Sequence, residues 1–150
     1  MKVHSVLPCV LLAASILATD LYAQDQASSG TSVKVPANKI EFVHTGVVRE
    51  GKEILLGPAY GDYKTGKHGS FVRFPGGYVS KLHFHTSDYY AVIVEGTLSN
   101  PLRNEKDAPL PPGSYYYQKG GEAHYTKCIS KEDCLIFIIS DGKWDTKVTD

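Results

Sequence analysis

The amino-acid sequence predicts an all-β fold, an antiparallel sandwich or barrel, and three observations point to it. Short apolar runs of strand length follow one another, and turn residues such as Gly57-Pro58 and Pro75-Gly76-Gly77 separate them. Aromatic residues make up 11% of the chain, with ten tyrosines, and aromatic side chains favour strands. No stretch of the sequence combines helical periodicity with capping residues. The expected strands are residues 40–43, 53–56, 70–74, 78–85, 90–94, 115–117, 123–128 and 135–139.

Length and charge limit the classes of protein to which the chain can belong. Its 150 residues suit one domain, and a hydrophobic share of 42% with 21% charged residues allows a core to form. We place this domain at residues 40–150, after a flexible polar lead-in at residues 24–39. The formal net charge is zero, and the basic surface of a nucleic-acid binder is therefore not indicated. We expect a small-molecule ligand or substrate and no nucleic acid.

The first 23 residues have the features of a secretory signal peptide. Lys2 and His4 give a short positive start, residues 6–18 are apolar, and Leu21-Tyr22-Ala23 resembles a cleavage site. The apolar run is shorter than the roughly 20 residues that cross a bilayer. The alternative is an N-terminal membrane anchor or a core helix. We expect a periplasmic or secreted protein with no membrane span after cleavage.

Export changes the interpretation of the three cysteines. Cys9 leaves with the signal peptide, so the mature chain contains only Cys128 and Cys134. An even pair in an oxidising compartment favours a disulfide, and the polar residues between the two resemble a hairpin loop. The alternative is a pair of buried free thiols.

Three histidines are the candidate metal ligands. His83 and His85 are separated by one residue, so on a strand both side chains point to the same face. His124 lies on a later expected strand, directly after a glycine-rich turn. Neutral imidazole is the commonest metal ligand in proteins, although a His-x-His pair alone is a weak indication.

The residues around these histidines resemble the two motifs of the cupin superfamily. The first motif matches at residues 77–96, with Tyr89 in the position where the family has Glu, and its matching residues are Gly77, His83, His85 and Gly96. The second matches at residues 113–128, with Lys119 in place of Pro and Cys128 in place of Asn, and its matching residues are Gly113, Gly120, Gly121 and His124.

The chain therefore resembles a small secreted single-domain cupin over roughly residues 40–140. Residues 111–115 and 124–128 are also similar to the cupin domain of zinc-binding anti-sigma factors. The resemblance implies an all-β cupin jelly-roll β-barrel, a double-stranded β-helix. Small cupins often pair through strands, so a homodimer is a further expectation.

The resemblance also implies one divalent transition metal, held by His83, His85 and His124. Iron or zinc is the foremost candidate, and nickel, copper and manganese remain open, because imidazoles suit all of them. The fourth ligand of the family, a Glu, is replaced by Tyr89. We expect Tyr89 to contact a metal-bound water rather than coordinate as phenolate, with Asp88 as an alternative source of a carboxylate ligand.

By function, the resemblance implies an exported metal-binding cupin that is a metal-dependent enzyme. Three-His cupins include enzymes that cleave carbon–carbon bonds with dioxygen, so we expect a dioxygenase-like oxidoreductase acting on a small oxygenated substrate. Tyr89 and Glu122 are the candidate proton carriers, and Arg73, Tyr78 and Tyr117 are the candidate substrate-binding residues.

Two other functions remain open at this point. One is a non-catalytic module that binds or senses a metal or ligand, and the other is a sugar-acid isomerase or lyase. The remaining histidines, His44 and His68, have no partner at ligand spacing, and we expect them at the surface.

Overall fold

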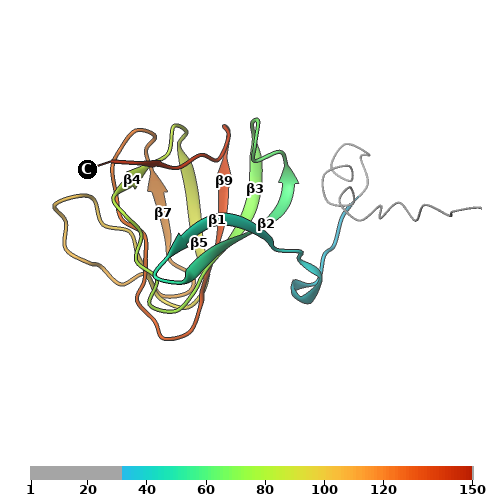
Figure 1. Cartoon of the computed structure of the whole chain (residues 1–150). Coiled ribbons are helices and arrows are strands. Elements are labelled where there is room, and N and C mark those ends of the chain that lie inside the picture. Colours follow the sequence, from blue (N-terminus) through green and yellow to red (C-terminus); the bar gives the residue numbers. More distant parts are fainter. Residues whose placement is uncertain (1–31, 150) are drawn as a thin grey trace, which may run out of the picture.

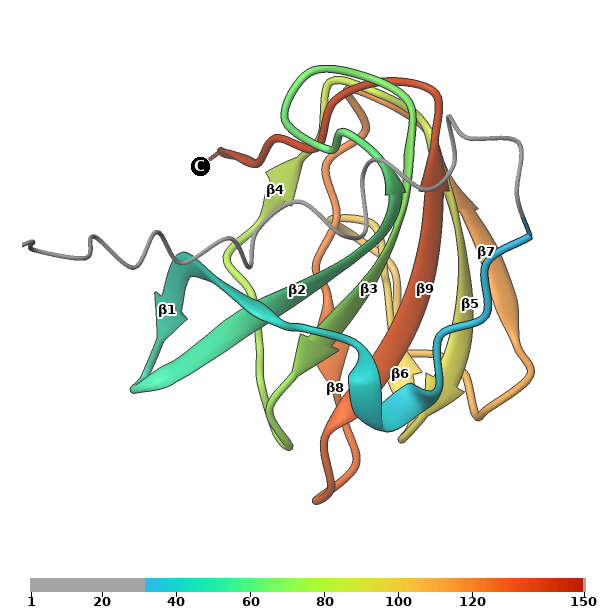
Figure 2. The ribbon, with the colours of Figure 1, turned by 90° about the vertical axis from the view of Figure 1, so that its right-hand side faces the viewer.

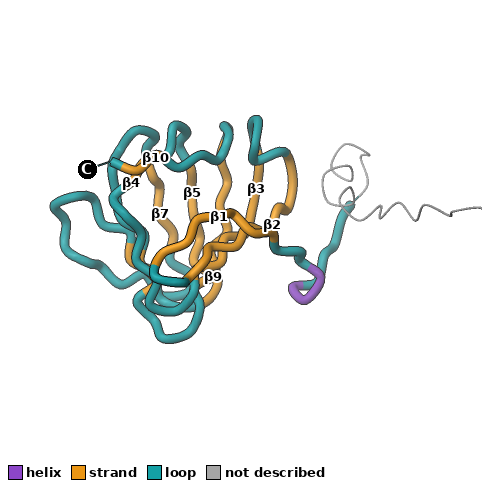
Figure 3. Tube along the Cα trace, in the orientation of Figure 1, coloured by secondary structure: helices purple, strands orange, loops and turns teal. Residues whose placement is uncertain are grey.

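The described part of the chain is built almost entirely from strands and loops (Figure 1). The computed structural model describes residues 32–149, so the expected signal peptide and the beginning of the expected lead-in lie outside the described residues. Within the described part there is a single 3₁₀ turn, η1 (Ala37–Lys39), in the segment that precedes the sheet (Figure 3). No helix in residues 32–149 has the length and apolar character needed to cross a membrane.

A six-stranded antiparallel sheet forms the main layer of the fold. Its strands lie in the order β1-β2-β3-β9-β5-β7, and Figure 2 shows them side by side in this order. Strands that are distant in sequence therefore pair, as they do in a jelly roll. The bounds are β1 (Val43–Arg49), β2 (Lys52–Gly61), β3 (His68–Phe74), β5 (Tyr89–Glu95), β7 (Tyr115–Gln118) and β9 (Cys134–Ser140).

Four short strands form two small antiparallel ladders outside the six-stranded sheet. One ladder pairs β4 (His83–Phe84) with β10 (Lys147–Val148), and the other pairs β6 (Leu98–Ser99) with β8 (Lys127–Cys128). Isolated bridges, among them His83 to His124, extend this pairing between segments that are otherwise loops. The histidine-bearing segments belong to this irregular part of the fold.

The core lies along the inner face of the large sheet and follows the two-residue period of its strands. On β3, His68, Ser70, Val72 and Phe74 are buried, whereas Phe71 and Arg73 between them are only partly buried. The neighbouring strands contribute further fully or nearly fully buried side chains: Tyr89, Ala91 and Ile93 from β5, and Leu135, Ile136 and Ile138 from β9.

Three of the expected strands differ from the observed ones, and one of them, expected at residues 123–128, is a strand only at Lys127–Cys128. The first was expected at residues 40–43, but β1 begins at Val43, and a two-residue turn of Glu50 and Gly51 connects it to β2. Both turn residues have positive φ, 49° and 75°, as the tight turns of hairpins require. Of the expected strand 78–85, only His83–Phe84 is a strand, because this segment pairs through isolated bridges rather than a continuous ladder.

The expected disulfide between Cys128 and Cys134 is present in the structure. It joins the end of β8 to the start of β9, with a Cα–Cα distance of 5.6 Å and a sequence separation of 6. Both residues are buried in the core, at 1% and 0% exposure.

We expect reduction of this disulfide to lower the free energy of unfolding by about 2 kcal/mol, because the closed loop is short. Urea unfolding with and without reductant measures the difference. The double variant Cys128→Ser, Cys134→Ser is the control, and its unfolding midpoint should not respond to reductant. Equal midpoints of the wild-type protein in both conditions would contradict the expectation.

Candidate metal centre

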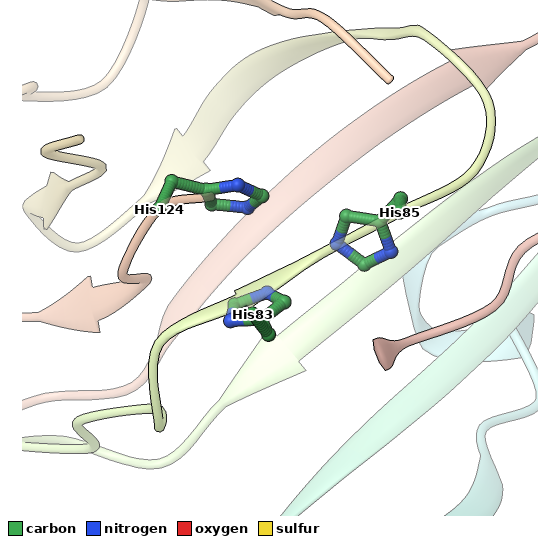
Figure 4. Close-up of side chains that lie close together, drawn as sticks. All are labelled: His83, His85 and His124. Atoms are coloured by element: carbon green, nitrogen blue, oxygen red, sulfur yellow. The ribbon is translucent and has the colours of Figure 1, made fainter. Parts of the chain in front are cut away.

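The three histidines converge in the interior. His83 is the first residue of β4, His85 follows that strand directly, and His124 lies opposite them (Figure 4). Figure 4 shows the three rings turned toward one another. Their candidate ligand nitrogens all lie within 4.8 Å of one another, and all three residues are buried. The predicted convergence of these side chains is confirmed.

Backbone pairing holds the two histidine segments together. His83 and His124 form an antiparallel bridge in which each backbone N–H donates to the other carbonyl, at 3.0 and 2.9 Å. The carbonyl of His85 accepts a third hydrogen bond, from the backbone N–H of Gly121 at 2.8 Å. The glycine-rich turn before His124 therefore fixes the position of the third imidazole.

Each imidazole is oriented by a hydrogen bond from its Nδ1 to a backbone carbonyl. His83 Nδ1 lies 2.9 Å from the carbonyl oxygen of Lys81, and His124 Nδ1 lies 3.0 Å from that of Glu122. His85 Nδ1 donates to the carbonyl of Asp145. A carbonyl only accepts, so the proton of each neutral ring is on Nδ1 and the lone pair is on Nε2. Metal-binding histidines are held in this way.

Burial keeps all three imidazoles neutral near pH 7. It is the largest cause that lowers the pKa of His85 to about 3 and the pKa of His124 to about 4, and the neighbouring imidazole of His83 lowers both further. Burial also lowers the pKa of His83. The neutral ring is the form that binds a metal, so the donor set fits a divalent transition metal.

Tyr89, which stands where cupins have Glu, lies against this cluster. Its side chain is 2% exposed, and its hydroxyl is 3.4 Å from Nε2 of His124. Burial raises the pKa of Tyr89 well above its ordinary value, so the phenol keeps its proton and donates it toward this nitrogen. A protonated hydroxyl beside the cluster is more consistent with a proton donor than with a phenolate ligand.

Residues 33–147 match a family described as a domain of unknown function, DUF4437. The chain belongs to this family. Comparison with curated proteins finds no match. The expected likeness to zinc-binding anti-sigma factors stays a prediction for this DUF4437 domain.

Among solved structures, the DUF4437 domain is similar to proteins of the cupin fold. The polyketide cyclase RemF from Streptomyces resistomycificus superimposes with a TM-score of 0.63 at 14% identity, covering 80% of this chain and 87% of that chain. A predicted oxalate decarboxylase from Thermotoga maritima gives a TM-score of 0.60 at 17% identity, covering 73% of this chain and 99% of that chain.

A chain from the crystal structures of the DMSP lyases RdDddP and RnDddQII gives a TM-score of 0.60 at 15% identity, covering 75% of this chain and 63% of that one. The DUF4437 domain thus spans less than two thirds of this lyase chain. Together these likenesses confirm the expected cupin jelly-roll fold.

A C-terminal aromatic residue that the sequence reasoning missed completes the surroundings of the cluster. Trp144, the single tryptophan of the chain, stacks on His85 with ring centroids 4.2 Å apart and an interplanar angle of 28°. Trp144 also packs edge to face against Tyr89 at 5.3 Å and against His68 at 6.3 Å. The next residue, Asp145, accepts hydrogen bonds from the backbone N–H and hydroxyl of Thr86. The segment around Trp144 and Asp145 therefore holds the loop that follows His85 in place.

A cavity of about 570 Å³ opens beside the histidines. His83 and His85 form part of its wall, together with Tyr89 and Trp144, whereas His124 does not. Much of the remaining wall comes from β1, β2 and β3. The volume is typical of small-molecule sites. Tyr78, expected to bind substrate, is 1% exposed and also lies in this wall.

Arg73 lies outside the cavity wall. It was a candidate to face inward and hold an anionic substrate, with a solvated or paired strand residue as the alternative. It alternates with the buried Val72 and Phe74 and so points to the outer face of β3. Its guanidinium is 3.6 Å from Glu95 and stacks over the ring of Phe42 at 5.0 Å. The sequence did not reveal this, because large apolar residues occur on both faces of the strand.

Tyr117 and Glu122 also lie outside the cavity wall. Tyr117 is 48% exposed, and its hydroxyl donates to Asp88 at 2.7 Å. Asp88, the alternative metal ligand, is exposed and also accepts the backbone N–H of Gly120, so its carboxylate is held away from the cluster. Glu122 is exposed, and only its backbone carbonyl contacts His124.

The expectation for the other two histidines was half right. His44 is exposed, as expected, and its Nδ1 lies 2.9 Å from Oε2 of Glu53. His68 is 0% exposed, because it shares the inner face of β3 with Ser70, whose hydroxyl is 3.0 Å from its Nδ1. The alternation of buried and exposed side chains along the strand, rather than the spacing of metal ligands, could have predicted that His68 is buried.

Proposed function

We propose that the protein is a metal-dependent enzyme of the cupin fold that acts on a small oxygenated organic substrate. The observation that carries this proposal is the cluster of three neutral imidazoles, His83, His85 and His124, of which His83 and His85 line a cavity of about 570 Å³. They would hold one divalent transition metal, iron or zinc foremost.

The donor set supports a catalytic rather than a structural site. Structural zinc sites are closed by four protein ligands, whereas catalytic sites keep a position open. In the described part of the chain the cluster consists of three histidines, with no carboxylate or thiolate among them. A bound metal would supply Lewis acidity and a template for oxygen ligands.

The chain's own residues would divide the remaining tasks. Tyr89 keeps a proton on its hydroxyl, lies in the cavity wall and is placed to donate that proton to a substrate there. Trp144 covers one face of His85 and keeps water from that side of the cluster. Tyr78 contributes its phenol to the cavity wall. The exposed Glu122 is a weaker candidate for proton transfer than Tyr89.

Two reaction classes suit this site. The first is the dioxygenase-like oxidoreductase that the three-His motif implies. The second is lyase or isomerase chemistry, which needs only a Lewis acid and a proton carrier, and the protonated hydroxyl of Tyr89 favours it. Similar folds include a DMSP lyase and a predicted oxalate decarboxylase. Oxygen uptake by the iron-loaded protein distinguishes the first class from the second.

We also propose that the protein acts in the periplasm or outside the cell. The features of residues 1–23 support export, and the Cys128–Cys134 disulfide suits an oxidising compartment. Recovery of a shortened chain in the extracellular or periplasmic fraction tests this, and full-length protein in the cytosol would contradict it.

The metal content of the purified protein tests the site. We expect about one iron or zinc per chain by elemental mass spectrometry, and its loss in the double variant His83→Ala, His85→Ala. The matched control is His44→Ala, which removes an exposed imidazole and should leave the metal content unchanged.

Metal that persists in the double variant would contradict the assignment of these ligands. Absence of metal from the wild-type protein, even after reconstitution with iron or zinc, would favour a non-catalytic ligand-binding module instead.

A further inference from the structure

Two of the cavity's polar groups lack a hydrogen-bond partner. In residues 32–149, three buried side-chain atoms have none: Nε of Arg49, Oη of Tyr116 and Nε2 of His68. Arg49 and Tyr116 both lie in the wall of the cavity. Buried polar atoms without partners are rare in folded proteins, because each costs its full desolvation. Arg49 can only donate, so a ligand that satisfies it supplies acceptor atoms.

Within residues 32–149, the cavity wall contains two cationic side chains that are not paired with a carboxylate. Arg49 and Lys81 have no carboxylate within 4.0 Å among the described residues. The wall's carboxylate, Asp145, is occupied by hydrogen bonds from Thr86 and lies 4.0 Å from Lys143. Arg49 is partly buried and its Nε atom is fully buried without a partner in the described part of the chain, so the wall favours an anionic group next to this guanidinium.

Arg49 and the histidines border the same space. Arg49 ends β1, and its charge opposes the effect of burial, which raises the pKa of the Tyr78 hydroxyl. Tyr116 contacts Tyr89 with ring centroids 6.0 Å apart, and Tyr89 in turn contacts His85 at 5.3 Å. The cavity thus offers a cation in one part of its wall and the histidine cluster with two phenols in another.

The wall between these polar groups is apolar. Leu56, Val72, Phe74 and Ile136 line it, and each is at most 4% exposed. An inorganic anion would leave this surface uncovered. A ligand that matches the whole wall combines an anionic group with an apolar body.

We propose that the cavity binds an organic acid, whose carboxylate pairs with the guanidinium of Arg49 and whose apolar body extends toward the three imidazoles. This inference rests on the proposed function, since it names the substrate class of the same site. The planar guanidinium suits a carboxylate because it can donate two parallel hydrogen bonds.

Calorimetric titration with three probes tests the proposal: 3-phenylpropionate, its neutral amide 3-phenylpropionamide, and phenyl phosphate. The protein is used both metal-free and zinc-loaded, at about 0.1 M salt. We expect the acid to bind the metal-free protein at least about 10-fold more tightly than the amide. Arg49→Gln should weaken acid binding by about 10- to 100-fold and leave amide binding unchanged.

Arg73→Gln is the matched control, because it removes an arginine from the outer face of the same sheet, and it should leave both affinities unchanged. Arg49→Lys keeps the charge and should bind the acid with intermediate affinity. This variant and the wild-type preference for acid over amide decide the question if Arg49→Gln does not fold.

Four outcomes would overturn the proposal. They are no binding of the acid, equal binding of acid and amide, an unchanged acid affinity in folded Arg49→Gln, and tighter binding of phenyl phosphate than of the carboxylate. Failure of the protein to bind zinc counts against the proposed function alone, since the metal-free comparison still decides the role of Arg49.

Discussion

Acidification from pH 7 to pH 5 is expected to lower the free energy of unfolding of the metal-free protein by about 4 kcal/mol. The reason is the burial of neutral imidazoles. The folded-state pKa of His85 is about 3 and that of His124 about 4, whereas both titrate near 6.5 when exposed in the unfolded chain. Below about pH 6.5 the unfolded chain therefore binds more protons than the folded one, and stability falls as the pH falls.

The size of this effect follows from the slope of the free energy of unfolding against pH. Each such imidazole contributes about 1.4 kcal/mol per pH unit between its two pKa values, hence about 2 kcal/mol by pH 5. Burial also lowers the pKa of His83 and His68, which act in the same direction. The carboxyl groups with lowered pKa values, such as Asp145, titrate mainly below this window.

Urea unfolding of the chelator-treated protein at several pH values measures the dependence. His124→Gln replaces one titrating ring by a neutral amide and should reduce the loss by about 2 kcal/mol. His44→Ala removes an exposed ring and should leave the loss unchanged. A free energy of unfolding that is constant from pH 7 to pH 5 would contradict the burial of neutral imidazoles.

The histidine cluster could be predicted because its information is local in the sequence. The pair His83 and His85 obeys strand parity, and the glycines before His124 form the turn that positions it. The disulfide was predictable for the same reason, since Cys128 and Cys134 lie either side of one short loop.

The rest of the cavity could not be predicted, because contacts distant in sequence build it. Trp144 reaches His85 across 59 residues (144 − 85), and no motif marks it. Arg49 lies on β1, a strand that the sequence reasoning placed too early, at residues 40–43. Arg73 was chosen instead, although the buried Val72 and Phe74 on either side place it on the outer face.

Trp144→Ala is expected to weaken zinc binding at least about 10-fold and to destabilise the fold by about 3 kcal/mol. The indole stacks on His85, and the carbonyl of the following residue, Asp145, accepts the Nδ1 proton of that ring. Loss of the indole frees the ring and loosens the segment that orients it. Trp144→Phe keeps an aromatic face and should retain most of the affinity.

Competition with a chelating dye measures the zinc affinity, and Tyr117→Ala is the control because it removes an aromatic ring from the outer face. Since Trp144 is the single tryptophan, its fluorescence in the wild-type protein also reports metal binding directly. Stoichiometric copper should quench it, and His83→Ala, His85→Ala should abolish the response. If folded Trp144→Ala bound zinc as tightly as the wild-type protein, the backbone contact between Asp145 and His85 alone would be sufficient to orient the ligand.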